Sequence, residues 1–352
     1  DHRDLHSFPT RRSSDLPVST FTLPNGLTVV LAEDHSLPKV VIATRFAVGS
    51  KNEAPGRTGF AHLFEHLMFM GTHRVPGNQF DMLMETAGGE NNAFTSEDNT
   101  TYYSLGPAEI LPTLLWLDAD RLQQLDDAMT AEKVDLQRSV VRNERRQSYE
   151  NAPYGQAALV LPEMLWPEGH PYRHPVIGSH EDLQAATFED VQAFFRSWYV
   201  PGNAVLVVAG DFDPAQARQA VEETFGAVPA RPVAALPPAP PAGLAGEVRR
   251  VLVDQVEFPQ LVLVWHSPAR YAEGDAAMTL AAGLLAGSAS SRLDRRLKIE
   301  RQLAQDITAF QDSRELSGLF QIEITAAPGA DLEEIKRETL AVLADLQNAG
   351  PT

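Results

Sequence analysis

Two histidines and a glutamate, His62, His66 and Glu65, form the pattern HxxEH, which is the strongest chemical signal in this sequence. On a helix, two residues four apart lie about 40° apart on one face and one turn apart, so both imidazoles can reach one metal ion. Glu65 lies about 60° to the other side of His62, where it can contact a metal-bound water without binding the metal. The chain has no cysteine, so any metal must be held by His and carboxylate side chains. Two imidazoles, one carboxylate and an open fourth position are typical of catalytic zinc.

The alternative is an amphipathic helix whose histidines are partly buried and hydrogen-bonded to carbonyl groups. Apolar residues flank the pattern on both sides, among them Leu63, Phe64 and Leu67. Three ionisable groups in such surroundings carry large desolvation costs unless something compensates them. A divalent ion would do so, and this favours the metal interpretation.

The third ligand must come from elsewhere in the chain, and spacing alone cannot select it. The eligible carboxylates are Glu85, Glu90, Glu97, Glu144 and Glu150. Glu144 has some merit because it follows two valines on a strongly predicted helix that faces a core, whereas Glu97 sits in a polar turn. The residues themselves leave the choice open.

The elements that position the HxxEH pattern can be read from periodicity. We expect a helix over residues 59–70, preceded by a hairpin over 18–35 with an Asn25-Gly26 turn and by a strand over 40–48. Further expected elements are a strand over 100–105, helices over 109–125, 130–149 and 187–198, and a strand over 204–209. Because strands and helices mix without strict alternation, we predict an α+β fold with a largely antiparallel sheet.

A Pro/Ala/Gly-rich stretch, residues 231–246, is predicted to be a semi-rigid linker between a catalytic domain, 17–230, and a second domain, 247–352. A strand over 261–265 and a helix over 276–286 then repeat the opening of the first domain. Aligning Gly71 with Gly287 puts Met278, Ala281 and Ala282 where the HxxEH residues stand. We therefore expect two duplicated domains of similar fold. The alternative is that the likeness is accidental, because any two strand-loop-helix units align this well.

The ends and the composition set further limits. Residues 1–16 resemble translated sequencing-adaptor sequence and are interpreted as non-native, and a helix-like segment running into Thr352 predicts that the second domain is incomplete. The net charge, 29 − 47 = −18, excludes a nucleic-acid backbone as a favoured partner. No apolar run approaches the ~20 residues that a membrane span needs.

Longer segments carry a family resemblance. GFAHLFEHLMFMGT, AGGENNAFTSEDNTTYY, VVRNERRQSYENAPYG and FFRSWYVPGNAVLVVAGDFDP occur in this order. Together they resemble the pitrilysin/insulinase family of zinc metallopeptidases, the inverzincins, and most of all the bacterial relatives of the mitochondrial processing peptidase β-subunit. The resemblance implies the fold of that family, in which two similar domains each pack helices on a mostly antiparallel sheet, as in LuxS-like metallohydrolases.

The resemblance also implies roles for single residues. It makes His62, His66 and Glu144 the ligands of Zn²⁺ and Glu65 the general base. The segment from residue 90 to 95 would be an edge strand that pairs with an extended peptide, which implies that substrate contacts come from Asn92, Ala93 and Phe94. Gln137 stands where some branches of the family carry a functional glutamate. It could hydrogen-bond near the site, and we assign it no acid-base role.

The predicted function is a zinc endopeptidase that hydrolyses unstructured peptides through a metal-activated water. The alternative is a non-catalytic or partner-dependent subunit, because this family closes a chamber from two halves and this chain supplies less than one. The partner would be a second half or another copy of the chain. A small-molecule lyase of the LuxS type is disfavoured, since such proteins are much shorter and use a cysteine. The sequence leaves the compartment open, with a bacterial periplasm or cell envelope favoured.

Overall fold

The computed structural model describes residues 16–350, so all of the adaptor-like segment except Leu16 lies outside the described residues. The chain divides into two compact units. The first comprises the residues up to Asn143 together with Val176–Pro237, and the second comprises Glu144–Pro175 and the chain from Pro238 onward. The division falls inside one continuous helix, α4 (Ala131–Arg145), so its last two residues are counted with the second unit.

The first unit contains a six-stranded sheet with the order β1-β2-β6-β3-β5-β4. The strands are β1 (Val18–Thr22), β2 (Thr28–Glu33), β3 (Lys39–Phe46), β4 (Glu90–Thr95), β5 (Thr100–Pro107) and β6 (Ala204–Gly210). Strands β2 and β6 pair in parallel, and the other neighbouring pairs are antiparallel. The predicted hairpin forms from β1 and β2, with Gly26 at a φ of 93° in the turn. The predicted α+β class is confirmed.

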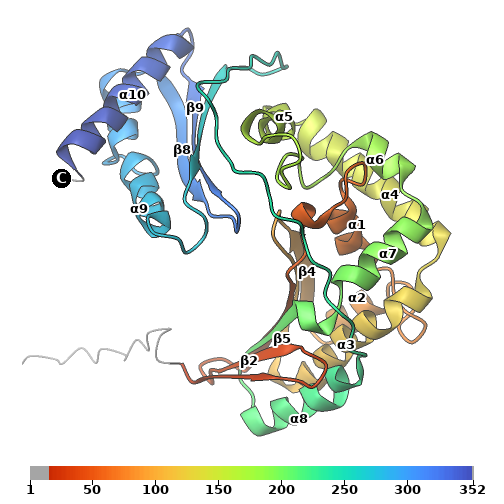
Figure 1. Ribbon diagram of the computed structural model, residues 1–352. Helices are drawn as coiled ribbons and strands as arrows, with labels where there is room; N and C mark the ends of the chain where they lie inside the picture. Colours follow the sequence, from red (N-terminus) through yellow and green to blue (C-terminus); the bar gives the residue numbers. More distant parts are fainter. Residues whose placement is uncertain (1–15, 351–352) are drawn as a thin grey trace, which may run out of the picture. The chain divides into compact units, whose positions relative to one another are not determined.

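The helices of the first unit are α1 (Phe60–Leu67), α2 (Gln79–Thr86), α3 (Leu111–Ala128), α4, α6 (His180–Ala185), α7 (Phe188–Trp198) and α8 (Pro214–Thr224). Helices α1, α2 and α3 pack against the sheet, α7 packs on α1 and α3, and α8 packs on α3 (Figure 1). Helix α7 begins as predicted, because the Thr187 side chain accepts from the Asp190 N–H and the Asp190 side chain accepts from the Thr187 N–H. Helix α1 is shorter than the predicted 59–70, and the predicted helix 130–149 changes after Arg145 into a π-helical turn, Arg146–Glu150.

An aromatic core fixes the apolar side of α1. Phe64 is fully buried, and its ring centroid lies 5.6 Å from that of Phe195 and 5.2 Å from that of Tyr199. The Tyr102 hydroxyl on β5 donates to the Phe64 carbonyl at 3.2 Å. Because one stripe of α1 is held in this core, the residues of the opposite stripe are presented together on the other side of the helix.

The second unit contains a three-stranded antiparallel sheet with the order β7-β9-β8. Its elements are α5 (Gln156–Leu165), β7 (Gln260–Ser267), α9 (Asp275–Leu285), β8 (Ala304–Asp312), β9 (Gly318–Ala326) and α10 (Leu332–Ala349). Side chains of β9 alternate between its two faces. Ile322 and Ile324 pack in a core with residues of α9 and α10, whereas Leu319 packs with Trp166, directly after α5, and with Tyr172.

The two units repeat one order of elements. In the first, β3, α1, β4, β5 and α3 occur in this order, with α2 inserted between α1 and β4, and β5 lies between β3 and β4. In the second, β7, α9, β8, β9 and α10 occur in this order, and β9 lies between β7 and β8. Helices α1 and α9 both start after a left-handed glycine, Gly59 at φ 91° and Gly274 at φ 93°. This shared topology supports the predicted duplication.

The helix starts correct the register of the sequence comparison by one residue. Aligned on Gly59 and Gly274, α9 places Ala277, Leu280 and Ala281 where α1 carries His62, Glu65 and His66. This list replaces Met278, Ala281 and Ala282, because the two helices end differently although they begin alike. Either register leaves α9 without a metal-binding side chain at these places.

Residues 229–259 form neither helix nor strand, and they include the proline-rich stretch 231–246. The domain limits 17–230 and 247–352 stay a prediction. Among residues 16–350, no helix combines the length and the apolar character that crossing a membrane requires.

Candidate metal centre

Helix α1 is held at its start by the partly buried carboxylate of Glu53. The two carboxylate oxygens of Glu53 accept hydrogen bonds from the backbone N–H groups of Gly59 and Ala61, each at 2.8 Å. No side chain at the N-cap position does this, since that residue is glycine. Burial raises the pKa of Glu53 well above its usual value, and the N–H donors oppose the rise. Sequence reasoning missed Glu53, because it lies in a loop outside any capping pattern.

His62 and His66 bring their imidazoles together on the side of α1 that faces away from the aromatic core. Their Nε2 atoms lie 3.3 Å apart, and the ring planes are 80° apart with centroids at 4.9 Å. Two imidazole ligands of one tetrahedral zinc ion, each at ~2.0–2.1 Å, have their nitrogens about 3.3 Å apart. The separation therefore suits two ligands of one ion.

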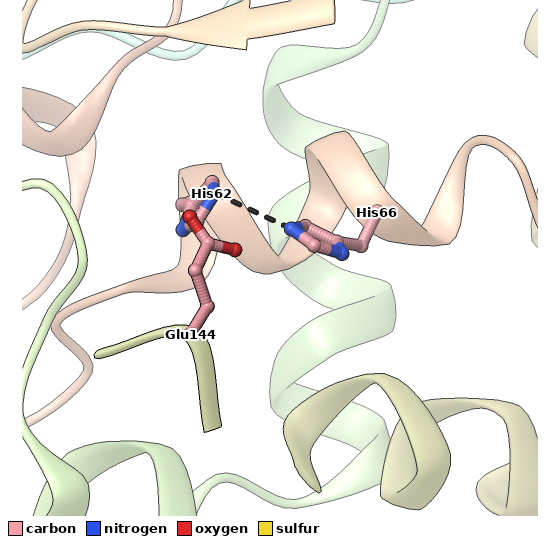
Figure 2. Close-up of side chains that lie close together, drawn as sticks. All are labelled: His62, His66 and Glu144. Carbon is pink, nitrogen blue, oxygen red and sulfur yellow. Dashed lines mark hydrogen bonds between the residues drawn. The ribbon is translucent and has the colours of Figure 1, made fainter. Parts of the chain in front are cut away.

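Glu144 comes to this pair from the last turn of α4 (Figure 2). One of its carboxylate oxygens and one nitrogen of each imidazole all lie within 4.8 Å of one another. Among residues 16–350, no other group of three or more His, Asp and Glu side chains meets this condition. The structure thus brings one of the five eligible glutamates to the histidines, and the other four are not part of the group. Two nitrogens and a carboxylate oxygen are a donor set that fits Zn²⁺.

Glu65 lies beside the histidine pair rather than within the three-residue group. Its Oε2 atom is 4.0 Å from Nε2 of His62, and the two side chains are 15% and 11% exposed. The Thr95 hydroxyl donates to the same Oε2 atom at 2.6 Å. Glu65 is therefore directed toward β4, the strand on which Thr95 is the last residue.

Strand β4 is the free edge of the six-stranded sheet, since it pairs with β5 alone. Its side chains alternate, with Asn92 and Phe94 more exposed than Ala93, and Phe94 is 51% exposed. The Ala93 N–H donates to Oδ1 of Asn92 at 2.8 Å. The three predicted substrate residues thus lie on an edge strand whose last residue contacts Glu65, and their role stays a prediction.

Gln137 lies on α4, two turns before Glu144. Its Nε2 atom donates to the Met70 sulfur at 2.7 Å. This contact is with the segment that follows α1, so Gln137 joins α4 to the end of the helix that carries the histidines. The structure gives no contact between Gln137 and the three-residue group.

Comparison with known proteins adds independent findings. A family model described as "Insulinase (Peptidase family M16)" matches residues 28–166, and one described as "Peptidase M16 inactive domain" matches residues 185–352. The chain is 27% identical over 330 residues to the zinc protease PqqE of Helicobacter pylori, which covers 93% of this chain and 74% of the relative.

Solved structures share the fold. The crystal structure of a protease from Helicobacter pylori matches with a TM-score of 0.89 and 26% identity, covering 96% of this chain and 81% of that one. The periplasmic protease PqqL from Escherichia coli matches with a TM-score of 0.72 and 21% identity. That match covers 97% of this chain and 41% of the PqqL chain.

Proposed function

The chain belongs to peptidase family M16, the insulinase family, and on this premise we propose that it is a zinc metalloendopeptidase. The observation that carries the proposal is the convergence of His62, His66 and Glu144, from two helices, with Glu65 beside them. A helix whose histidines merely satisfied carbonyl groups would not need a carboxylate from a second helix at the same point.

We assign the three converging residues as the zinc ligands and Glu65 as the general base. Bound zinc would polarise the scissile carbonyl and lower the pKa of a coordinated water toward neutrality. The Glu65 carboxylate would accept a proton from the attacking water and deliver it to the nitrogen of the leaving amine. No covalent bond between protein and peptide is needed in this scheme.

The substrate would be an extended, unstructured peptide that adds a strand to the free edge of β4. Backbone hydrogen bonds of this kind require no particular side chain in the peptide, whereas the exposed ring of Phe94 offers an apolar contact. The Ala93 N–H would exchange its bond to the Asn92 side chain for one to the peptide.

A second candidate function is a subunit that needs a partner. Its support is the match to PqqL, in which the same fold occupies 41% of a longer chain. We propose that this chain pairs with a second half of similar fold, or with another copy of itself. The description of PqqL as periplasmic also fits our preference for the bacterial cell envelope, which fractionation of a producing cell would check.

The test combines metal analysis with cleavage of a quenched fluorescent peptide. We expect one zinc per chain, cleavage that chelation abolishes and zinc restores, and no cleavage by Glu65→Gln despite bound zinc. Cleavage that persists in a metal-free sample would refute the mechanism. One bound zinc without any cleavage by the chain alone would favour the partner-dependent subunit.

A further inference from the structure

We propose that Thr95 is a positioning residue that orients Glu65 for proton transfer, a role that rests on the function proposed above. The Thr95 hydroxyl and the Glu65 carboxylate are 2.6 Å apart, with the oxygen Oε2 as the acceptor. That same oxygen is 4.0 Å from Nε2 of His62. The hydrogen bond therefore fixes the carboxylate where it faces the histidine pair.

The direction of this hydrogen bond follows from the neighbours of Thr95. The nearest other hydroxyl, that of Thr100, donates its single hydrogen to the Val48 carbonyl at 2.9 Å. The Thr100 oxygen lies 3.5 Å from the Thr95 oxygen. Because its own hydrogen is used, it can only accept a hydrogen bond from Thr95. The Glu65 oxygen, at 2.6 Å, is a much closer acceptor than the Thr100 oxygen, so the Thr95 hydroxyl donates its hydrogen to Glu65.

The backbone after Thr95 is locked by the loop that follows β3. The N–H of Ser50 donates to the Ser96 carbonyl at 3.2 Å, and that of Lys51 donates to the Glu97 carbonyl at 3.0 Å. Lys51 also forms an ion pair with Asp98 at 3.2 Å, and these two side chains are 4% and 2% exposed. The turn cannot shift without breaking these bonds.

Gly49 shows how closely the two segments meet. A Cβ atom at this position would lie 2.3 Å from the Ser96 carbonyl oxygen, which is far inside contact distance. Only glycine permits this approach of backbone to backbone. Thr95 is consequently presented to Glu65 from a rigid support, which is what orientation of a catalytic group requires.

Thr95 also ends the strand on which the peptide is proposed to bind. A peptide paired with β4 would extend the sheet hydrogen bonding beside Thr95, so peptide binding and base orientation involve the same strand. Since Thr95 points to Glu65 and the peptide would pair through the strand edge, loss of the hydroxyl should slow the chemical step and leave peptide binding intact.

Thr95→Val and Thr95→Ser provide the test, with Thr86→Val as a matched control. Valine keeps the shape and removes the donor, serine keeps the donor, and the Thr86 hydroxyl bonds only within α2, to the Met82 carbonyl at 2.7 Å. We expect kcat of Thr95→Val to fall about ten- to a hundredfold with KM and zinc content unchanged, while Thr95→Ser and Thr86→Val stay near the parent chain. An unchanged kcat in Thr95→Val, or an equal loss in Thr95→Ser, would overturn the proposal.

A crystal structure of zinc-loaded Thr95→Val supplies a readout that does not depend on turnover. We expect the Glu65 carboxylate to turn away from its place beside His62, and to return to it in Thr95→Ser. An unmoved carboxylate in Thr95→Val contradicts the orienting role even if the parent chain proves to cleave no peptide. Absent cleavage by the zinc-loaded parent, with a carboxylate that does move, would instead count against the proposed function alone.

Discussion

Helices α1 and α9 occupy the same place in the two repeats, and only α1 carries groups that can do chemistry. Both begin after a left-handed glycine and both follow a strand of the sheet. At the places of the two histidines and Glu65, α9 has Ala277, Ala281 and Leu280, and Leu280 is 72% exposed. The second repeat thus has the same topology without these polar side chains, so the fold alone does not require them in α1.

The acidic residues at the starts of the two helices differ in the direction of their pKa shifts. Glu53 is partly buried beside α1, and burial raises its pKa well above the usual value. Asp275 opens α9 and accepts from the Ser313 hydroxyl at 2.5 Å and from Gln311 at 3.1 Å, and the hydrogen bond from Ser313 is the main cause of its lowered pKa. Because the pKa of Glu53 is raised and that of Asp275 is lowered, the two acids have opposite effects on stability as pH changes.

The largest effect should come from making α1 resemble α9. His62→Ala places the residue of α9 in α1, and we expect zinc affinity to fall at least about a hundredfold, with peptide cleavage lost. Competition with a fluorescent chelator measures the affinity. The matched control is Ala277→His in α9, which should leave the zinc stoichiometry unchanged because Ala281 stands at the place of the second histidine.

A smaller effect is expected from the support of α1. Glu53→Gln leaves one acceptor oxygen for two backbone N–H donors, so we expect a loss of about 1–3 kcal/mol in the stability of α1. Hydrogen exchange followed by mass spectrometry should show faster exchange in the peptides that cover residues 60–67. Glu189→Gln, at an exposed glutamate in the first turn of α7, is the control and should exchange as the parent does.

The smallest effect is the opposite response of the two helices to acid. Glu53 binds its proton more tightly in the folded chain than in the unfolded chain, so its contribution to stability falls as pH rises above its usual value of 4.5. Asp275 releases its proton more readily when folded, so its contribution is present above its usual value of 3.8 and is lost as pH falls through the lowered value.

Hydrogen exchange at several pH values, corrected for the intrinsic rate, measures this contrast. Lowering the pH should weaken the protection of α9 against exchange and leave that of α1 intact. Asp275→Asn should reduce the pH dependence of protection in α9, and Glu53→Gln should reduce it in α1. If α1 and α9 lost protection to the same extent in acid, and the two variants behaved as the parent chain does, Glu53 and Asp275 would not cause the pH dependence.

Much of the first unit could be predicted from the sequence, because its elements carry local signals. The Asn25-Gly26 turn, the 3.6-residue period of α1 and the Thr187 cap each act within a few residues. Helix α8 has such a local signal as well, because Asp213 stands directly before Pro214 and its side chain accepts from the Gln216 N–H. This helix is nevertheless not among the elements predicted from the sequence. Helix α2 was missed because its stretch looked only polar and turn-rich.

The site was predictable in part for the same reason. The histidine pair is local, whereas Glu144 meets it through tertiary packing that residue spacing cannot reveal, and the family resemblance pointed to it. Glu53 and Thr95 carry no recognisable pattern, because Glu53 accepts two hydrogen bonds from a loop position outside any capping motif and Thr95 acts through a hydrogen bond to a residue thirty positions away. Strands β8 and β9 were not anticipated either, since their pairing with β7 depends on contacts between distant segments.

The central claim is that His62, His66 and Glu144 hold one zinc ion. Anomalous diffraction at the zinc edge from crystals of the zinc-loaded protein tests it most directly. We expect one strong peak at about 2.0–2.2 Å from an imidazole nitrogen of each histidine and from a carboxylate oxygen of Glu144. A peak elsewhere, or a Glu144 carboxylate turned away from a zinc ion bound by the histidines, would contradict the account.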